Sequence, residues 1–158
     1  MNMHEYAERV EGIRDKLYRT AVLCLGSASD AEEALDEAVY RGLKACKRLR
    51  EPAFFDTWMT RILLNVCHDI RRERKRMIPT AEFPDAAAPD GTGPADLRDC
   101  LLRLDEKERT AVLLYYIEGY DIRQTAAILR VPQGTVKSRL SRGRKQLREF
   151  CREEVFEA

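Results

Sequence analysis

Residues 121–148 read DIRQTAAILRVPQGTVKSRLSRGRKQLR and carry the strongest structural signal in the chain. Asp121 is a favoured residue type for starting a helix, and apolar residues follow it at helical spacing. The dipeptide Val131-Pro132 predicts a turn, because proline does not continue a helix. A longer helix is expected from Gln133 to about Cys151. A short helix, a turn and a longer helix are the plan of a helix-turn-helix.

The second of these helices has the residue types of a DNA-reading helix. Val136 and Leu140 recur at helical spacing and predict its buried side. Hydroxyl and basic side chains lie off that side, and they suit contacts with base edges and phosphates. We predict that this helix enters the major groove with six residues: Thr135, Lys137, Ser138, Arg139, Ser141 and Arg142. The alternative is a solvated basic helix face, which is what most charge runs are.

The charge of the chain is unevenly distributed. The formal net charge is +1 over 158 residues, yet Tyr120 to Arg152 holds nine Lys/Arg and two Asp/Glu, a local charge of +7. The rest of the chain therefore sums to −6. A basic end on a nearly neutral chain indicates a polyanion at that end and a different partner elsewhere.

Upstream, three further helices are predicted before a change of composition. The first runs from about Tyr6 to Leu25 and stops at Gly26. Ser29 or Asp30 is expected to cap the second, which continues to about Cys46. The third has Pro52 in its first turn and ends in the basic residues 71–76.

Residues 77–94 contain four prolines and are predicted to be a linker without helix. After them, Asp105 is expected to cap a helix, with Glu108 completing a capping box. The sequence thus predicts an all-α protein of two small helical domains joined by a Pro/Ala-rich linker. The expected boundaries are 1–76, 77–94 and 95–158, with the helix-turn-helix in the last part.

Cysteine and histidine usage argues against a metal or disulfide framework. The five cysteines are scattered, with no CxxC pair, and are expected to be buried reduced thiols. His68 has no second ligand at suitable spacing, so a surface position is expected. No apolar run approaches the roughly 20 residues that span a bilayer, so no membrane insertion is expected. We therefore predict no metal, no cofactor and a reducing, cytoplasmic setting.

Two stretches resemble one known family. Val131–Leu140, after Thr125–Leu129, closely resembles the DNA-binding fourth region of bacterial extracytoplasmic-function (ECF) sigma factors. Independently, Phe55–Ile62, followed by Asn65 and Asp69, looks like the second region of the same family. Both matches occur in the family's order with a linker between them, so the resemblance covers nearly the whole chain.

One departure from the family pattern concerns the turn of the helix-turn-helix. Arg130 stands where the family usually has glycine. A left-handed turn at this position would cost a non-glycine residue about 1 kcal/mol. Arg130 is therefore expected either to reshape the turn or to add a phosphate contact.

The resemblance implies a promoter-specific role. In the family the fourth region reads the minus-35 element, and the second region binds RNA polymerase core and helps open the minus-10 element. Carried onto this chain, the minus-10 contacts fall on Asn65, His68, Asp69 and Arg72. A structural asparagine that bonds backbone is the alternative reading of Asn65. The neighbouring Arg71, Arg74, Lys75 and Arg76 are suited to phosphates.

The same family resemblance implies that an acidic helix of this chain docks on the polymerase. The residues are Asp30, Glu33, Asp36 and Glu37, which would meet a basic coiled coil of the β′ clamp. Asp36 departs from the glutamine that relatives often carry, which affects a detail of this contact. A solvated acidic helix face is the alternative.

The loop at about Lys47 to Asp56 resembles the family's pocket for a base flipped out of the minus-10 element, where unstacking costs a few kcal/mol. Trp58 is expected in the core. Of Phe54 and Phe55, one is expected to face inward and the other the loop.

The partners that follow are RNA polymerase core, through the β′ clamp and β flap, and double-stranded and melted promoter DNA. The family also implies an anti-sigma factor. No small-molecule substrate and no catalysis are expected, since the polymerase performs the chemistry. A conventional regulator with an N-terminal sensor or dimerisation domain explains the helix-turn-helix equally well, but not Phe55–Ile62. A thiol-dependent enzyme is a third hypothesis, for which no catalytic motif is present.

Overall fold

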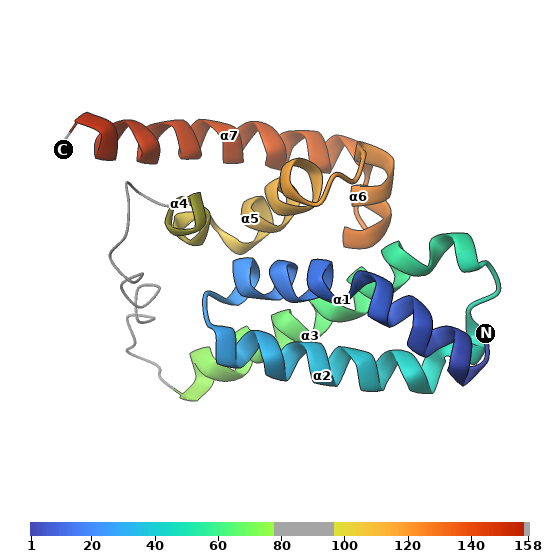
Figure 1. Ribbon diagram of the computed structural model, residues 1–158. Helices are drawn as coiled ribbons and strands as arrows, with labels where there is room; N and C mark the ends of the chain where they lie inside the picture. Colours follow the sequence, from blue (N-terminus) through green and yellow to red (C-terminus); the bar gives the residue numbers. More distant parts are fainter. Residues whose placement is uncertain (78–96, 157–158) are drawn as a thin grey trace. The chain divides into compact units, whose positions relative to one another are not determined.

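The computed structural model describes residues 1–77 and 97–156, with side chains as far as residue 150. The chain divides into two compact units, Met1–Ala81 and Glu82–Ala158. All regular elements of the described residues are helical (Figure 1). The predicted all-α fold with two helical domains is therefore confirmed. The predicted linker lies outside the described residues except for Met77, where a helix ends.

The first unit is a bundle of three long helices (Figure 1). They are α1 (Met3–Leu25), α2 (Ala28–Ala45) and α3 (Phe55–Met77), and each packs against the other two. Two short 3₁₀ turns, η1 (Cys46–Arg48) and η2 (Pro52–Phe54), occupy the loop between α2 and α3. Pro52 thus begins η2 and not α3, which starts at Phe55.

The junction of α1 and α2 shows why these helices end where they do. Gly26 adopts φ 74°, a left-handed conformation open to glycine, and stops α1 as predicted. The next residue, Ser27, caps α2 and accepts a hydrogen bond from the Asp30 amide at 3.2 Å. The predicted caps Ser29 and Asp30 are therefore wrong. Both residues already lie inside the first turn of α2.

The core of the first unit is built around Tyr6 and Phe55. Their rings pack edge to face at 6.0 Å between centroids. The Tyr6 hydroxyl donates to the Val39 carbonyl oxygen at 2.6 Å, beside Gly42, where any side chain would collide with that hydroxyl. Trp58, predicted to be core, is only half-buried and packs on Phe55 at 5.8 Å.

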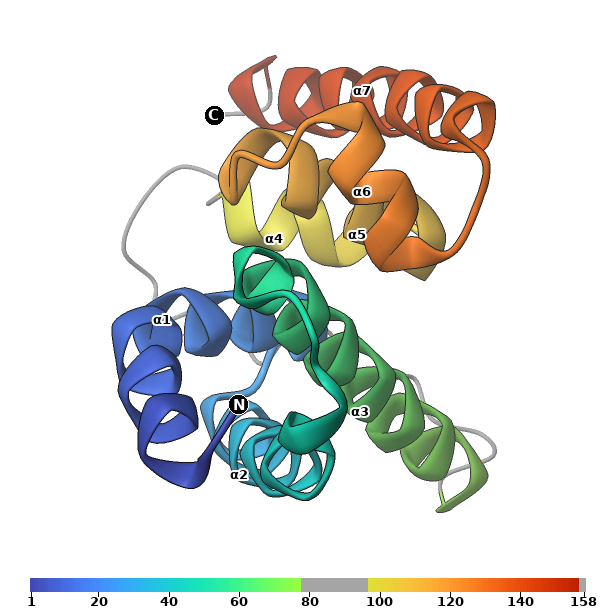
Figure 2. The same ribbon diagram turned by 90° about the vertical axis from the view of Figure 1, so that its right-hand side faces the viewer.

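The described residues of the second unit form four α-helices and one π-helical turn around a second core. These are α4 (Leu97–Arg103), α5 (Glu106–Val112), η3 (Leu113–Ile117), α6 (Ile122–Leu129) and α7 (Gln133–Phe156). Helix α7 packs against α4, α5 and α6, and a turn joins α6 to its start (Figure 2). Segment η3 continues α5 with π-helical hydrogen bonds, and Gly119 at φ 80° ends this run.

The start of α5 differs from its predicted form. Asp105 is the N-cap residue, but its side chain makes no capping hydrogen bond. The predicted capping box with Glu108 is therefore wrong, since the Glu108 carboxylate faces Arg142 of α7 instead. The link between α4 and α5 is made by the buried Arg109. Its guanidinium donates to the carbonyl oxygens of Leu101, Leu102 and Leu104 at 2.8 to 3.0 Å.

Candidate nucleic-acid interface

The turn between α6 and α7 has the geometry of a helix-turn-helix. Asp121 caps α6 in a capping box with Gln124, at 2.7 and 3.0 Å. Arg130 ends α6 in the left-handed conformation, at φ 57°, ψ 47°. Its side chain is exposed. The chain thus keeps the left-handed turn although a non-glycine residue occupies it. The expectation that Arg130 reshapes the turn is wrong.

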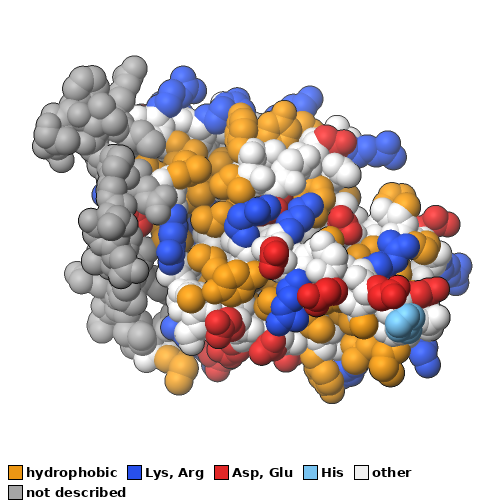
Figure 3. Space-filling view, viewed as in Figure 1, with side chains coloured by type: hydrophobic (Ala, Val, Ile, Leu, Met, Phe, Trp, Pro, Cys, Tyr) orange, Lys and Arg blue, Asp and Glu red, His pale blue; other side chains and the backbone are white. Residues whose placement is uncertain are grey.

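The first half of α7 presents the predicted reading face. Val136 and Leu140 are buried. The exposed side chains are Lys137, Ser138, Ser141 and Arg142, while Thr135 and Arg139 are half-buried. Basic side chains gather along the edge that α7 forms in Figure 3. Small hydroxyl residues between these basic groups leave the helix surface open to close approach.

Two arginines of α7 are held by neighbouring elements of the second unit. Arg142 pairs with Glu108, with 3.2 Å between Nε and Oε1. Arg144 Nη1 donates to the hydroxyl oxygen of Tyr116, on η3, at 2.9 Å. The basic face is therefore partly fixed by contacts from α5 and η3.

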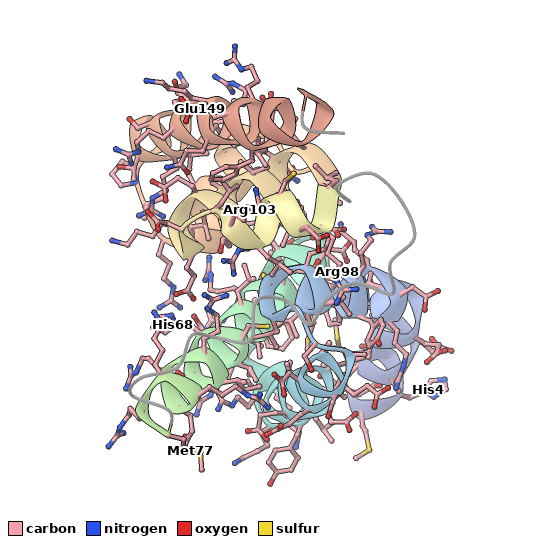
Figure 4. All side chains as sticks on the ribbon, turned by 90° about the vertical axis from the view of Figure 1, so that its left-hand side faces the viewer. His4, His68, Met77, Arg98, Arg103 and Glu149 are labelled. Atoms are coloured by element: carbon pink, nitrogen blue, oxygen red, sulfur yellow. The ribbon has the colours of Figure 1, made fainter. Side chains whose placement is uncertain are left out.

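A second candidate surface lies on α3. Asn65, His68, Asp69 and Arg72 are all exposed, and their spacing of three and four residues places them on one helix face. His68 lies on the outer side of α3 in Figure 4. The structure thus brings together the four residues that the sequence assigned to the minus-10 contacts.

Two neighbouring arginines do not belong to this face, although phosphate contacts were expected of them. Arg71 donates to the Cys24 carbonyl oxygen at 2.9 Å. Arg74 forms an ion pair with Asp30. Both therefore tie α3 to the rest of the three-helix bundle.

The acidic face of α2 retains three of its four predicted residues. Glu33 and Asp36 are exposed, and Glu37 is half-buried. On the face seen in Figure 3, acidic side chains gather over α1 and α2. Asp30 is the exception, because only 4% of it is exposed and its carboxylate is held by Arg74. We therefore correct the expectation that Asp30 belongs to the docking face.

Arg41 connects the acidic face of α2 to the exposed face of α3. Its guanidinium contacts Glu37 at 2.9 Å and Asp69 at 3.3 Å. The hydrogen bond to Glu37, and after it the one to Asp69, raises the pKa of Arg41. Sequence reasoning missed this residue. The only available signal was its position four residues after Glu37, where ion pairs form on a helix surface.

The loop before α3 exposes one aromatic residue. Phe55 is buried, whereas 61% of Phe54 is exposed. The loop is braced by Thr57, whose hydroxyl donates to the Phe54 carbonyl oxygen at 3.0 Å, and by Arg9, which donates to the Pro52 carbonyl oxygen at 3.2 Å. One phenylalanine thus faces inward and the other faces the loop surface, as expected.

Within the described ranges, no group of three or more His, Cys, Asp or Glu side chains is placed to hold a metal ion. In the same part of the chain, no helix combines the length and the apolar character that crossing a membrane requires.

Comparison with known proteins agrees with this geometry. Residues 10–77 match the family model for Sigma-70 region 2, and residues 95–147 match that for Sigma-70, region 4. The chain is similar to the ECF RNA polymerase sigma factor SigM of Mycobacterium tuberculosis, with 34% identity over 137 residues, covering 84% of this chain and 69% of SigM. It is 33% identical over 150 residues to the RNA polymerase sigma-E factor of Streptomyces avermitilis, covering 92% of this chain and 84% of that protein.

Solved structures share the fold. The sigma factor RpoE of Bartonella quintana, crystallised with the anti-sigma factor NepR, aligns with a TM-score of 0.78 at 23% identity, covering 92% of this chain and 95% of that chain. CnrH, solved in complex with the cytosolic domain of CnrY, aligns with a TM-score of 0.76 at 21% identity, covering 97% of this chain and 91% of that chain. Together with the sequence matches, the two domains show that the chain belongs to the ECF sigma factors, alternative sigma factors that bind RNA polymerase and direct promoter-specific transcription initiation.

Proposed function

We propose a division of labour between the two units of this sigma factor. The second unit reads the minus-35 element through the first half of α7. The first unit binds RNA polymerase core through α2 and helps to open the minus-10 element through α3. The observation that carries this proposal is the exposed face of α7, set by the buried Val136 and Leu140 and preceded by the left-handed turn at Arg130.

For the minus-35 element, α7 is proposed to lie in the major groove. Thr135, Ser138 and Ser141 are short enough to allow close approach, and their hydroxyls donate or accept hydrogen bonds with base edges. Lys137, Arg139 and Arg142 supply charge for phosphates and guanine edges. The basic second half of the described helix extends the phosphate contacts, because Arg144, Lys145 and Arg148 are also exposed.

For the minus-10 element, the exposed face of α3 is proposed to contact the melted strand. Asn65 offers an amide to a base edge or sugar, and Arg72 offers charge to a phosphate. The exposed Phe54 is suited to stack on a base that has left the duplex. Unstacking costs a few kcal/mol, which such contacts offset.

Polymerase docking is proposed for Glu33, Asp36 and Glu37. Acidic side chains on this helix would repel DNA, so a basic protein surface is the better partner. The β′ clamp is the proposed site for the first unit, and the β flap for the second. Asp30 is left out because it is buried.

The remaining parts of the proposal concern regulation and setting. We infer an anti-sigma partner, supported by RpoE and CnrH, whose structures hold NepR and the cytosolic domain of CnrY. The chain is proposed to act without catalysis, since the polymerase forms the phosphodiester bonds, and to work in the cytoplasm.

The proposal is tested in two steps. The chain is first run on gel filtration with bacterial RNA polymerase core, and the mixture is then used to transcribe a promoter-fragment library whose transcript starts are mapped. Coelution with core, and starts downstream of a shared two-part motif, are expected. DNA binding without coelution would overturn the docking assignment and favour a conventional regulator. Coelution without motif-dependent starts would overturn the assignment of α7 and α3 to promoter reading.

A further inference from the structure

A nearly buried carboxylate lies next to the proposed reading face of α7. Glu108, in the first turn of α5, exposes 11% of its side chain, whereas Arg142 exposes 62%. The ion pair joins Arg142 Nε to Glu108 Oε1 at 3.2 Å. A carboxylate so close to a DNA-binding surface would repel phosphates if no cation accompanied it. The ion pair with Arg142 supplies this cation and indicates that Glu108 does more than pack in the core.

The two helices pack tightly beside this ion pair. Gly143 follows Arg142, and a Cβ atom built there would lie 2.6 Å from Val112 Cγ2 and 3.7 Å from Glu108 Cβ. Glycine therefore allows α7 to pack directly on α5. The short distance between the backbones fixes the origin of both side chains. The ion pair restrains the Arg142 guanidinium on the side that faces Glu108.

The atom used by the pair matters for what Arg142 does next. A guanidinium is a planar fork with five N–H donors, and its two terminal nitrogens suit a pair of acceptor atoms. Glu108 engages Nε, the nitrogen nearest the main chain. The terminal nitrogens lie farther along the side chain than Nε, where a partner outside the protein can reach them. Arg142 also lies three and four residues after Arg139 and Ser138, on the proposed reading face.

We propose that Glu108 is a positioning residue for promoter recognition. It touches no DNA and holds Arg142 so that the terminal nitrogens face a pair of acceptor atoms on the minus-35 element. Guanine O6 and N7 form such a pair, and so do two phosphate oxygens. This inference rests on the proposed function of α7.

The test uses the full chain with polymerase core and a promoter whose minus-35 positions are randomised. Transcripts are sequenced for the wild type, Glu108→Gln, Arg142→Ala and the double variant. Glu149→Gln is the matched control, because it removes the same charge from an exposed position on α7 (Figure 4). Thermal midpoints are recorded, and all assays run below the lowest of them. Glu108→Asp, which keeps the charge on a shorter side chain, is the conservative variant.

If Arg142 reads guanine, Arg142→Ala lowers the preference at one position about tenfold, within the range for a bidentate base contact. Glu108→Gln then lowers the preference at the same position by roughly threefold, since a neutral amide restrains the guanidinium less. If Arg142 binds phosphate, both variants weaken transcription from all sequences evenly. Promoter binding measured over a range of salt concentrations then shows a slope reduced by about one for Arg142→Ala. In either case the effect of Glu108→Gln disappears in the double variant. The promoter preference or transcription level of Glu108→Asp then lies between that of Glu108→Gln and that of the wild type.

The inference is overturned if Glu108→Gln has the same effect with and without Arg142, because Glu108 would then act through folding alone. It is also overturned if Glu108→Gln behaves like Glu149→Gln. Arg142→Ala without effect, on a wild type that reads the library, removes this inference but not the proposed function. A wild type that binds core and shows no minus-35 preference removes the proposed function itself.

Discussion

Two glycines of α7 show how much one missing side chain matters. A Cβ at Gly143 would lie 2.6 Å from Val112 Cγ2, whereas one at Gly134 would meet nothing within 4 Å. Gly143 is thus required by the packing of α7 on α5, and Gly134 is not. Helical alanine is intrinsically more stable than glycine by up to about 1 kcal/mol. The same substitution should therefore have opposite signs at the two positions.

Gly143→Ala is expected to lower the free energy of unfolding by about 1 to 3 kcal/mol, the usual cost of overpacking. Gly134→Ala is expected to leave it unchanged or raise it slightly. Urea denaturation followed by circular dichroism measures both. Val112→Ala in the Gly143→Ala background should recover part of the loss, because it removes the colliding methyl group. Equal destabilisation by the two alanines would refute this account of the helix contact.

The stability of the first unit depends on alkaline pH through Tyr6. Its hydroxyl donates to the Val39 carbonyl oxygen, and burial, together with the nearby Cys46, raises the pKa of the phenol. A raised folded-state pKa means that the neutral phenol stabilises the fold below the unfolded value of about 10. This contribution is lost as pH rises above that value towards the folded pKa.

Tyr6→Phe is therefore expected to cost about 1 kcal/mol at pH 7, for the lost hydrogen bond. Above pH 10 the difference from wild type should shrink and then reverse, because phenylalanine carries no proton to lose. Urea denaturation of both proteins from pH 7 to 11 measures this difference. The other titrating groups are common to the two proteins and cancel. A difference independent of pH would contradict the assignment to Tyr6.

Among the helices, α2 and α3 are joined by two ion pairs of different burial. Arg74 meets Asp30, whose side chain is 6% exposed. Arg41 meets Asp69 of α3, which is about half exposed, and also pairs with Glu37 on its own helix. Breaking a pair that leaves a buried charge behind is costly, whereas exposed pairs contribute little. The two arginines therefore form a matched comparison within one helix interface.

Arg74→Ala is expected to destabilise the first unit by about 1 to 3 kcal/mol, less than for a fully buried pair because Arg74 itself is half exposed. Arg41→Ala should cost less than about 1 kcal/mol. Thermal unfolding in low and high salt gives both values. The Arg41 effect should weaken further in salt, since dissolved ions screen exposed charges. A larger loss from Arg41→Ala than from Arg74→Ala would reverse the order that burial predicts.

How well the sequence predicted a helix depended on the distance between the residues that define it. The stop at Gly26 and the helix start at Asp121 were predictable, because each depends on backbone conformation or on neighbours within a few residues. The roles predicted for Asp30 and Glu108 were wrong. Each carboxylate is claimed by an arginine on another helix, Arg74 or Arg142, which no local pattern reveals. The π-helical turn η3 was missed for a related reason, since its apolar run also fits an α-helix.

The candidate site followed the same rule. The family resemblance assigned Asn65, His68, Asp69 and Arg72 to one role, and the structure places them on one exposed face of α3. The residues that support the site were missed, because Arg41, Glu108 and Arg109 work through packing between helices. Residue type and period identify groups that face outward. They do not identify the groups that hold these in place.

For the whole molecule, we propose that the two units divide the functions of the sigma factor by charge. Acidic Glu33, Asp36 and Glu37 serve the proposed polymerase contact, and Lys137 and Arg139 serve the proposed minus-35 contact. Opposite charges suit opposite partners, so the two sets should fail in different ways. Glu33→Gln/Asp36→Asn/Glu37→Gln is expected to weaken binding to core about tenfold, since three charges that are exposed or half-exposed each contribute up to roughly 1 kcal/mol. Lys137→Ala/Arg139→Ala should leave core binding intact.

An excess of core separates the two defects. Mass action then restores transcription by the acidic-face variant, and its transcripts begin at the wild-type positions, because its reading helix is unchanged. The Lys137/Arg139 variant stays defective at any concentration of core, because its loss lies in the contact with DNA. Titrating core into promoter transcription and mapping the start sites measures both. Rescue of both variants, or of neither, would mean that docking and reading are not divided between α2 and α7, and both assignments would have to be redrawn.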